Sequence, residues 1–461
     1  MSITGAFIVP HPPIILPQVG RGEEEKIRKT ADAYRKVAGR IAAMKPDVII
    51  LTSPHTTLYA DYFHISPGKG AKGDLRRFGA SGFSIEVAYD SELVEAISDE
   101  ADRAGIHAGT MGERDKGLDH GTLVPLYFIN QAYTDYKLVR IGLSGFTSLD
   151  HYRFGKLIAK TVEKLGRKAV FVASGDLSHK LLEDGPYGFA PEGPEFDDNV
   201  TQAMEKADFL SFLNFDQSFC DSAAECGLRS FIIMAGALDG KSVKSELLSY
   251  EGTFGVGYGI ASYEVTGEDP GRHFDEIFIQ KEQERLLKIK SNEDPYVQLA
   301  RLSLETYVKS GKMARVPDNL PEEMLTRQAG VFVSLKKHGR LRGCIGTISP
   351  VTENIAQEIL RNAVSAGTED PRFPEVTTAE LPDLVYSVDV LSDPEPIQSI
   401  DELDVKRYGV IVTSGHRRGL LLPNLETIDT PEQQVEIALE KAGIRPGQSF
   451  SMERFEVVRH K

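Results

Sequence analysis

Apolar runs and amphipathic segments alternate along roughly the first 265 residues. Four of the runs have an apolar centre: "AFIV" (6–9), "DVIILTS" (47–53), "KLVRIGLS" (137–144) and "KAVFVASG" (168–175). Charged segments with helical spacing lie between them, such as "EEEKIRKTADAYRKVAGRIAAM" (23–44). Continuous apolar strands separated by helices predict a mainly parallel sheet covered by helices on both faces. A later stretch, "ELLSYEGTFGVGYGIASYEV", predicts a two-stranded hairpin that closes one side of this sheet.

The pattern changes at "TGEDPGRHFDEIFIQKEQERLLKIKSNEDP", which is highly charged and has few large apolar residues. We therefore expect an α/β domain over residues 1–268, a charged linker merging into a helix over 269–293, and a second domain over 294–461. The second domain mixes β-like segments such as "GVFVSLKK" and "YGVIVTSG" with amphipathic ones such as "TENIAQEILRNAVSAG". That order predicts a smaller α+β domain.

Composition narrows the class of protein. The chain is 41% hydrophobic and 26% charged, with a formal net charge of −15, which disfavours nucleic acid and anionic membranes as partners. No apolar run is long enough to span a bilayer, and the start of the chain lacks the features of a signal peptide. We expect a cytoplasmic protein. Both a monomer and a homo-oligomer are compatible with the sequence. The three cysteines do not suggest a disulfide framework, and Cys220 and Cys226 are interpreted as core residues.

Histidines occur where the predicted strands end. His11 and His55 each follow an apolar run and a proline, His179 follows "VFVASGDLS", and His120 lies in the glycine-containing turn of "GLDHGTLVPL". Ligands of open α/β sheets bind outside the carboxyl ends of the strands. One histidine at such a place is more often structural than functional, but four at the same edge indicate a site.

His11 and His55 are the expected metal ligands, because the preceding prolines stiffen their approach. Glu251, beside two glycines in "SYEGTFGVGYG", is the candidate third ligand, and Asp176 and Asp119 are rivals that adjoin other candidate residues. Two histidines and a carboxylate form the facial triad of non-haem Fe(II) enzymes, although the same ligand types also bind zinc.

The motifs "VPHPP", "TSPHTTLY", "LDHGTLVPL" and "SGDLSH" resemble those of class III extradiol ring-cleavage dioxygenases of the protocatechuate 4,5-dioxygenase catalytic-subunit type, and of the related Memo proteins. The resemblance implies that His11, His55 and Glu251 hold Fe(II), that His179 is the acid/base, and that His120 contacts substrate or oxygen. In Memo proteins a cysteine can replace the glutamate ligand, and the presence of Glu251 favours the dioxygenase version.

The second domain contains "GRLRGCIGTISP" and "EDPRFPEV", which with "VYSVDVLSDPEPI" resemble the AMMECR family. Cys344 has two interpretations. The structural one is a thiol packed between two glycines, and the functional one is a nucleophile or metal ligand. In the functional interpretation, the nearby Arg342 lowers the pKa of the thiol. In prokaryotes, AMMECR domains are associated with Memo-like proteins and a radical-SAM protein.

Three functions follow. The first is an Fe(II)-dependent extradiol dioxygenase that cleaves a catechol or a related small hydroxylated aromatic. The second is a metal-binding partner of a radical-SAM enzyme, with chemistry that does not require O₂. The third is a zinc hydrolase, which suits the ligand types but matches the four-histidine pattern less well.

Overall fold

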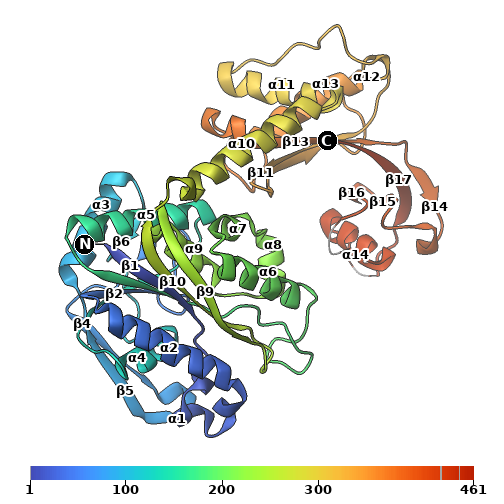
Figure 1. Cartoon of the computed structure of the whole chain (residues 1–461). Helices are drawn as coiled ribbons and strands as arrows, with labels where there is room; N and C mark the ends of the chain where they lie inside the picture. The colour runs from blue at the N-terminus through green and yellow to red at the C-terminus, as the bar shows by residue number, and fades with distance from the viewer. Residues whose placement is uncertain (1, 426–427, 446) are drawn as a thin grey trace. The chain divides into compact units, whose positions relative to one another are not determined.

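The computed structural model describes residues 2–425, 428–445 and 447–461, and the chain separates into two compact units, residues 1–280 and 281–461 (Figure 1). The division falls inside α10 (Phe274–Asn292), the helix that occupies most of the segment predicted as a charged linker. None of the helices in the described ranges has the length and apolar character that a bilayer span requires.

Unit 1 is built on a six-stranded sheet with the strand order β7-β2-β8-β1-β10-β9. The first four strands run parallel, and β10 and β9 add an antiparallel hairpin next to β1. The predicted mixed α/β unit with a parallel-containing sheet is thus confirmed. The strands of this sheet are β1 (Ile3–Val9), β2 (Val48–Ser53), β7 (Lys137–Gly142), β8 (Ala169–Ser174), β9 (Lys241–Glu251) and β10 (Tyr258–Glu268).

Helices cover both faces of this sheet. On one face, β-strand side chains such as Ile49 and Leu51 pack with α2 and α4, and on the other Ile50 and Ile141 pack with α3, α5 and α9. Every residue of β2 and β8 is buried, as expected for strands covered on both sides. The helices of unit 1 before α10 are α1 (Pro17–Gly20), α2 (Arg28–Met44), α3 (Ser91–Ala104), α4 (His120–Asn130), α5 (Ser148–Lys164), α6 (Glu192–Lys206), α7 (Phe209–Asn214), α8 (Gln217–Ala223) and α9 (Leu228–Ala237), with 3₁₀ turns η1 (Pro13–Ile15), η2 (Glu23–Ile27), η3 (Arg76–Phe78) and η4 (Pro270–Arg272).

Glycines bring α5 and α9 into close contact. A Cβ at Gly155 would lie 2.0 Å from the Ile233 carbonyl oxygen, and one at Gly236 would lie 1.9 Å from the Tyr152 carbonyl oxygen. Only glycine fits at these two positions, so the pair fixes how α9 lies across the sheet. The loop that precedes α9 is thereby held near the strand ends.

Two small sheets between β2 and α4 have no counterpart in the predicted pattern. Their strands are β3 (Phe63–His64) with β6 (Ala108–Gly109), which pair in parallel, and β4 (Gly70–Leu75) with β5 (Ala80–Ala88), which pair antiparallel. The short or polar sequences of these strands lack the continuous apolar run that marked the central sheet.

Unit 2 contains a seven-stranded sheet whose pairs are all antiparallel, in the order β12-β11-β13-β17-β15-β16 with β14 beside β17. Helices α11 and α13 pack on β11 and β13 through an apolar core that includes Val333 and Val388. The elements of unit 2 are α11 (Pro295–Ser310), α12 (Glu322–Thr326), β11 (Val331–Lys337), β12 (Arg340–Gly346), α13 (Ile355–Thr368), η5 (Thr378–Asp383), β13 (Leu384–Leu391), β14 (Glu395–Ile397), η6 (Ile400–Glu402), β15 (Tyr408–Ser414), β16 (Arg417–Leu421), α14 (Pro431–Ala442) and β17 (Ser451–His460).

Candidate metal centre

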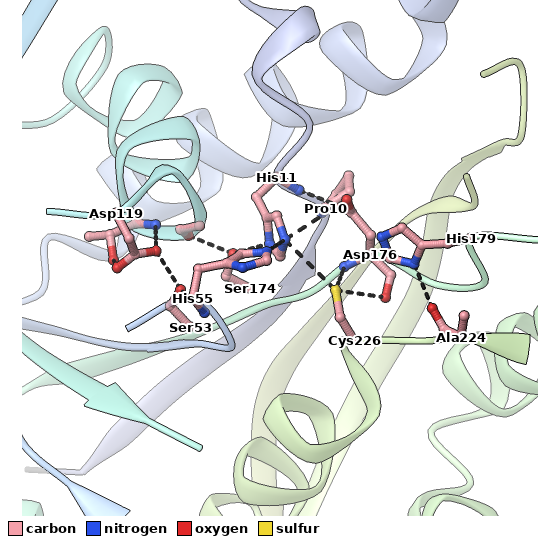
Figure 2. Close-up of polar contacts among 12 residues, drawn as sticks. Pro10, His11, Ser53, His55, Asp119, Ser174, Asp176, His179, Ala224 and Cys226 are labelled. Atoms are coloured by element: carbon pink, nitrogen blue, oxygen red, sulfur yellow. Dashed lines mark hydrogen bonds and ion pairs between the residues drawn. The ribbon is translucent and has the colours of Figure 1, made fainter. Parts of the chain in front are cut away.

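Four histidines and one cysteine meet at the carboxyl edge of the unit 1 sheet. His11 follows β1, His55 follows β2, His179 follows β8, and His120 begins α4. Cys226 lies in the loop between α8 and α9. Figure 2 shows His11 and Cys226 between His55 on one side and His179 on the other.

Three of these side chains point their ligand atoms at one another. The Nε2 atoms of His11 and His55 are 2.9 Å apart, and the Sγ atom of Cys226 is 3.8 Å from Nε2 of His11. One ligand atom from each residue lies within 4.8 Å of the others. Atoms bound to one ion at about 2.0–2.3 Å lie about 3–4 Å apart, so the arrangement has the dimensions of a metal site.

The tautomer of His11 follows from its partner. Ser174 donates its only hydroxyl hydrogen to the Gly121 carbonyl, at 2.6 Å, and its Oγ lies 2.9 Å from Nδ1 of His11. Ser174 must therefore accept from an Nδ1–H group. The Nε2 atom of His11 is left with a free lone pair directed at His55 and Cys226, as a metal ligand requires.

The backbone around His11 is fixed on both sides. The hydroxyl of Tyr34, on α2, donates to the carbonyl of Pro10, and the backbone N–H of His11 donates to Oδ1 of Asp176 at 2.7 Å. His11 itself is buried, whereas His55 is exposed, so the centre opens to solvent on the side of His55.

Glu251 does not belong to this group, and its prediction as third ligand is corrected. Its Oε2 atom accepts from both the backbone N–H and the hydroxyl of Thr30, each at 2.7 Å. Glu251 lies on β9, and β10 separates that strand from β1. With about 4.8 Å between neighbouring strands, two strand spacings already place β9 too far from His11 for a shared ion.

Cys226 takes the position predicted for Glu251, so the interpretation of Cys226 as a core residue is also wrong. Its sulfur accepts from the backbone N–H of Asp176 at 3.3 Å, and it is only partly buried. One signal could have identified it: a thiol directly before a glycine and an apolar helix, in a chain whose motifs resemble those of Memo proteins. Cys220 fits the core interpretation, because it is buried in the apolar cluster that contains α9.

Burial drives the ionisable groups of this centre toward their neutral forms. It lowers the pKa of His11 well below its usual value, with further lowering from the neighbouring histidines, and it raises the pKa of the Cys226 thiol well above its usual value. Burial also raises the pKa of Asp176 to about 7, against the effect of the His11 backbone N–H. A bound cation reverses this preference at the thiol, because metal ligands must be deprotonated.

The two remaining histidines flank the centre. Nδ1 of His179 lies 2.7 Å from the carbonyl oxygen of Ala224 and must donate to it. Burial lowers the pKa of His179 and favours the neutral ring, in which Nε2 then carries no proton. The ring of His120 lies 4.0 Å from that of His55 and 5.4 Å from that of His11. Burial, and next the charge of His55, lower the pKa of His120 to about 4, so His120 is neutral at physiological pH.

Asp119, one of the rival carboxylates, has a structural role. It caps α4 by accepting from the backbone N–H of Thr122, and its Oδ1 accepts from Ser53 at 2.6 Å. The buried guanidinium of Arg140 lies 3.8 Å from its other oxygen. Asp119 thus fixes the start of α4, where His120 is located.

The donor set decides which ions fit. Among the described residues, the converging group has two imidazoles and a thiol, not the two imidazoles and carboxylate of the Fe(II) facial triad. Imidazole with thiolate suits zinc, and it also suits iron or copper. A thiolate-ligated ion therefore fits this centre, and a facial-triad iron does not.

Unit 2 has a separate cysteine environment. Arg342, which the functional interpretation of Cys344 invokes, pairs with Glu380 at 2.9 and 3.1 Å. The sulfur of Cys344 accepts from the hydroxyl of Ser334 at 3.2 Å, and its backbone N–H donates to Asp370 at 2.9 Å.

Comparisons with known proteins agree with this architecture. A family model described as the catalytic LigB subunit of aromatic ring-opening dioxygenase matches residues 5–261, and the AMMECR1 family model matches residues 297–460. A Clostridium acetobutylicum protein is 46% identical over 475 residues, covering 100% of both chains. A Thermotoga maritima protein is 52% identical over 171 residues, which are 37% of this chain and 98% of that protein.

Among solved structures, an uncharacterized Pyrococcus horikoshii protein is 32% identical and covers 36% of this chain and 88% of its own, with a TM-score of 0.34. Because the first family model spans more than half of the chain and the Clostridium relative matches it throughout, the chain belongs to the family of the catalytic LigB subunit of aromatic ring-opening dioxygenases, joined to a C-terminal AMMECR1 domain.

Proposed function

We propose that unit 1 is a metal-dependent enzyme that acts on a hydroxylated aromatic compound, with one divalent ion held by His11, His55 and Cys226. The observation that carries this proposal is the convergence of two Nε2 atoms and one Sγ atom within 4.8 Å. Family membership supplies the aromatic substrate class, and the open side at His55 gives a substrate access to the centre.

The ion would supply Lewis-acid binding of a deprotonated substrate hydroxyl, together with redox chemistry where the ion is iron. The chain's own residues handle the protons. The neutral ring of His179 has an unprotonated Nε2, because Nδ1 donates to Ala224, so Nε2 is the atom that accepts the proton of a substrate hydroxyl and returns it. His120 is held at the start of α4 by the Asp119 cap and contacts the substrate from the opposite side.

The ligand test uses His11→Ala and His55→Ala, with Glu251→Gln as a matched control. After anaerobic purification, we expect the two histidine variants to lose stoichiometric metal and the glutamine variant to retain it, as measured by elemental analysis. His179→Ala should keep the metal and lose turnover. Retention of metal by both ligand variants would refute the proposal.

A second candidate is the metal-binding partner of a radical-SAM enzyme, with chemistry that does not consume O₂. Cys226 favours it, because a thiol at the centre is itself open to oxidation by O₂. The two candidates differ in an oxygen-electrode measurement on the metal-loaded protein with a panel of catechols. Oxygen uptake with ring-fission product supports the dioxygenase, and metal binding without uptake supports the second candidate.

A further inference from the structure

The exposed apolar side chains of unit 1 are concentrated at the edge of the sheet that carries the metal centre. The described part of unit 1 has seven large apolar or aromatic side chains with high exposure, and all seven belong to loops or strand ends at that edge or to the small sheets beside it. They are Leu58, Phe78, Met111, Leu182, Tyr187, Phe189 and Tyr250. Large exposed apolar side chains that gather at one edge, rather than scatter singly, are typical of a binding site.

Two aromatic rings of this group contact the flanking histidines directly. The ring of Phe78 lies 5.2 Å from that of His120, and the ring of Tyr187 lies 5.2 Å from that of His179. Phe78 is 38% exposed and Tyr187 is 62% exposed, so both rings keep surface that a ligand can contact. The two rings thus lie beside histidines on opposite sides of the metal centre.

Three further apolar side chains lie in the loops that carry His55 and His179. Leu58, 48% exposed, comes three residues after His55, while Leu182 and Phe189 belong to the loop that follows His179. Phe189 is placed by a β-bridge with Leu181. If the hydroxyl of a substrate binds the metal, the substituents on its ring would therefore contact these apolar side chains.

Charge at the centre does not favour an anionic substituent. The acidic side chains there are Asp176, 3.8 Å from Nε2 of His11, and Asp119, which is hydrogen-bonded to Ser53; neither offers a positive charge to a carboxylate substituent. The buried cation nearby, Arg140, is already engaged by Ser66, two backbone carbonyls and Asp119. Arg114, in the loop before α4, stacks on Tyr59 with 5.1 Å between its guanidinium carbon and the ring centre.

We infer that the substrate is a hydroxylated aromatic with an uncharged, apolar substituent, and that Phe78 and Tyr187 determine this specificity by contacting that substituent. The inference rests on the proposed function, in which the hydroxyl head binds the metal. It excludes a small aromatic acid as the preferred substrate.

The test compares three probes with one catechol head: 4-tert-butylcatechol, 4-methylcatechol and 3,4-dihydroxybenzoate. Zn²⁺-loaded protein is titrated with each by isothermal calorimetry, so the readout is affinity and not turnover. We expect tert-butylcatechol to bind at least about tenfold more tightly than dihydroxybenzoate, or about 1.4 kcal/mol. Methylcatechol should lie between them, because affinity follows the apolar area buried.

Phe78→Ala and Tyr187→Ala should each weaken tert-butylcatechol binding about three- to tenfold. They should leave dihydroxybenzoate within about twofold, because only the substituent contact is lost. Leu287→Ala, an exposed apolar change in α10, serves as the matched control and should change neither affinity. Equal affinities for all three probes, or an unchanged affinity in both aromatic variants, would overturn the inference and leave the metal site intact. If no catechol binds to protein whose metal content is confirmed, the proposed function fails and the inference fails with it.

Discussion

Cys226 and Cys344 occur in similar local sequences, each next to a glycine, but their neighbours in space differ completely. The sulfur of Cys226 lies 3.8 Å from an imidazole nitrogen that is left unprotonated by Ser174. The sulfur of Cys344 accepts from Ser334, and no histidine or second thiol joins it in a converging group within the described chain.

The backbone of Cys344 forms hydrogen bonds that close an edge of the unit 2 sheet. β12 is an edge strand, and edge strands expose unpaired N–H and C=O groups. Asp370 accepts from the Cys344 N–H at 2.9 Å, Arg372 donates to the Cys344 carbonyl at 3.4 Å, and the two side chains also pair with each other. The "EDPRFPEV" segment thus closes the edge of the sheet at this point. The chemistry of each thiol therefore depends on the groups that converge on it, not on its flanking glycine.

The largest expected difference between the two cysteines is in metal content. Cys226→Ala removes one of three ligands and should abolish stoichiometric metal binding, whereas Cys344→Ala should leave the metal content unchanged. Elemental analysis of both variants, purified anaerobically side by side, measures this. Equal metal loss in the two variants would remove the basis of the comparison.

Ser174, which contacts His11, and Ser334, which contacts Cys344, provide a second and smaller contrast. Ser174→Ala deletes the acceptor that fixes the tautomer of His11, and such supporting contacts are worth about 10–100-fold in metal affinity. Ser334→Ala removes only the hydrogen bond to Cys344 and should leave affinity unaltered. Competition with a metallochromic chelator gives both values. An unaltered affinity in Ser174→Ala would mean that the tautomer does not depend on this hydroxyl.

Removal of Asp370 tests the edge-closing role of its loop. Asp370→Ala leaves the Cys344 N–H without its acceptor and leaves the Arg372 guanidinium with the Cys344 carbonyl alone, which should destabilise β12 by about 1–3 kcal/mol. Hydrogen exchange of the peptide that contains Cys344 should accelerate accordingly, with unit 1 peptides as the internal control. Unchanged protection of β12 would show that the loop does not stabilise the edge.

The smallest effect concerns Glu380 and pH. The hydrogen bonds from Arg342 lower the pKa of Glu380 to about 2. Because an unfolded glutamate titrates near pH 4.3, its contribution to stability is complete above about that pH and is lost as pH falls toward about 2. Glu380→Gln should cost about 1 kcal/mol at pH 7 and flatten the acid decline of unit 2 between about pH 5 and 2. Urea unfolding of the full chain across that range measures it, and parallel pH curves for the two proteins would contradict it.

The sequence predicted those parts of the fold and site that depend on regular structure. Parallel strands end at one edge, so the positions of His11, His55 and His179 after β1, β2 and β8 were enough to predict that they meet. Neutral forms of His120 and His179 could not be predicted, because they depend on burial and on partners such as the Ala224 carbonyl.

Cys226 escaped prediction for a physical reason. It follows an excursion of about fifty residues after β8, through α6, α7 and α8, and no periodicity along that path predicts where the chain returns. The prediction of Glu251 as a ligand was wrong because the position of this residue depends on the order of β9 and β10 in the sheet. The hairpin pattern alone does not say which of the two strands pairs with β1.

X-ray absorption of the metal in the anaerobically purified protein reports directly whether Cys226 is a ligand. Ligation by His11, His55 and Cys226 should give one sulfur scatterer at about 2.3 Å together with imidazole nitrogens at about 2.0–2.1 Å, and the sulfur shell should be lost in any metal that Cys226→Ser retains. A first shell made only of nitrogen and oxygen in the wild-type protein would contradict it.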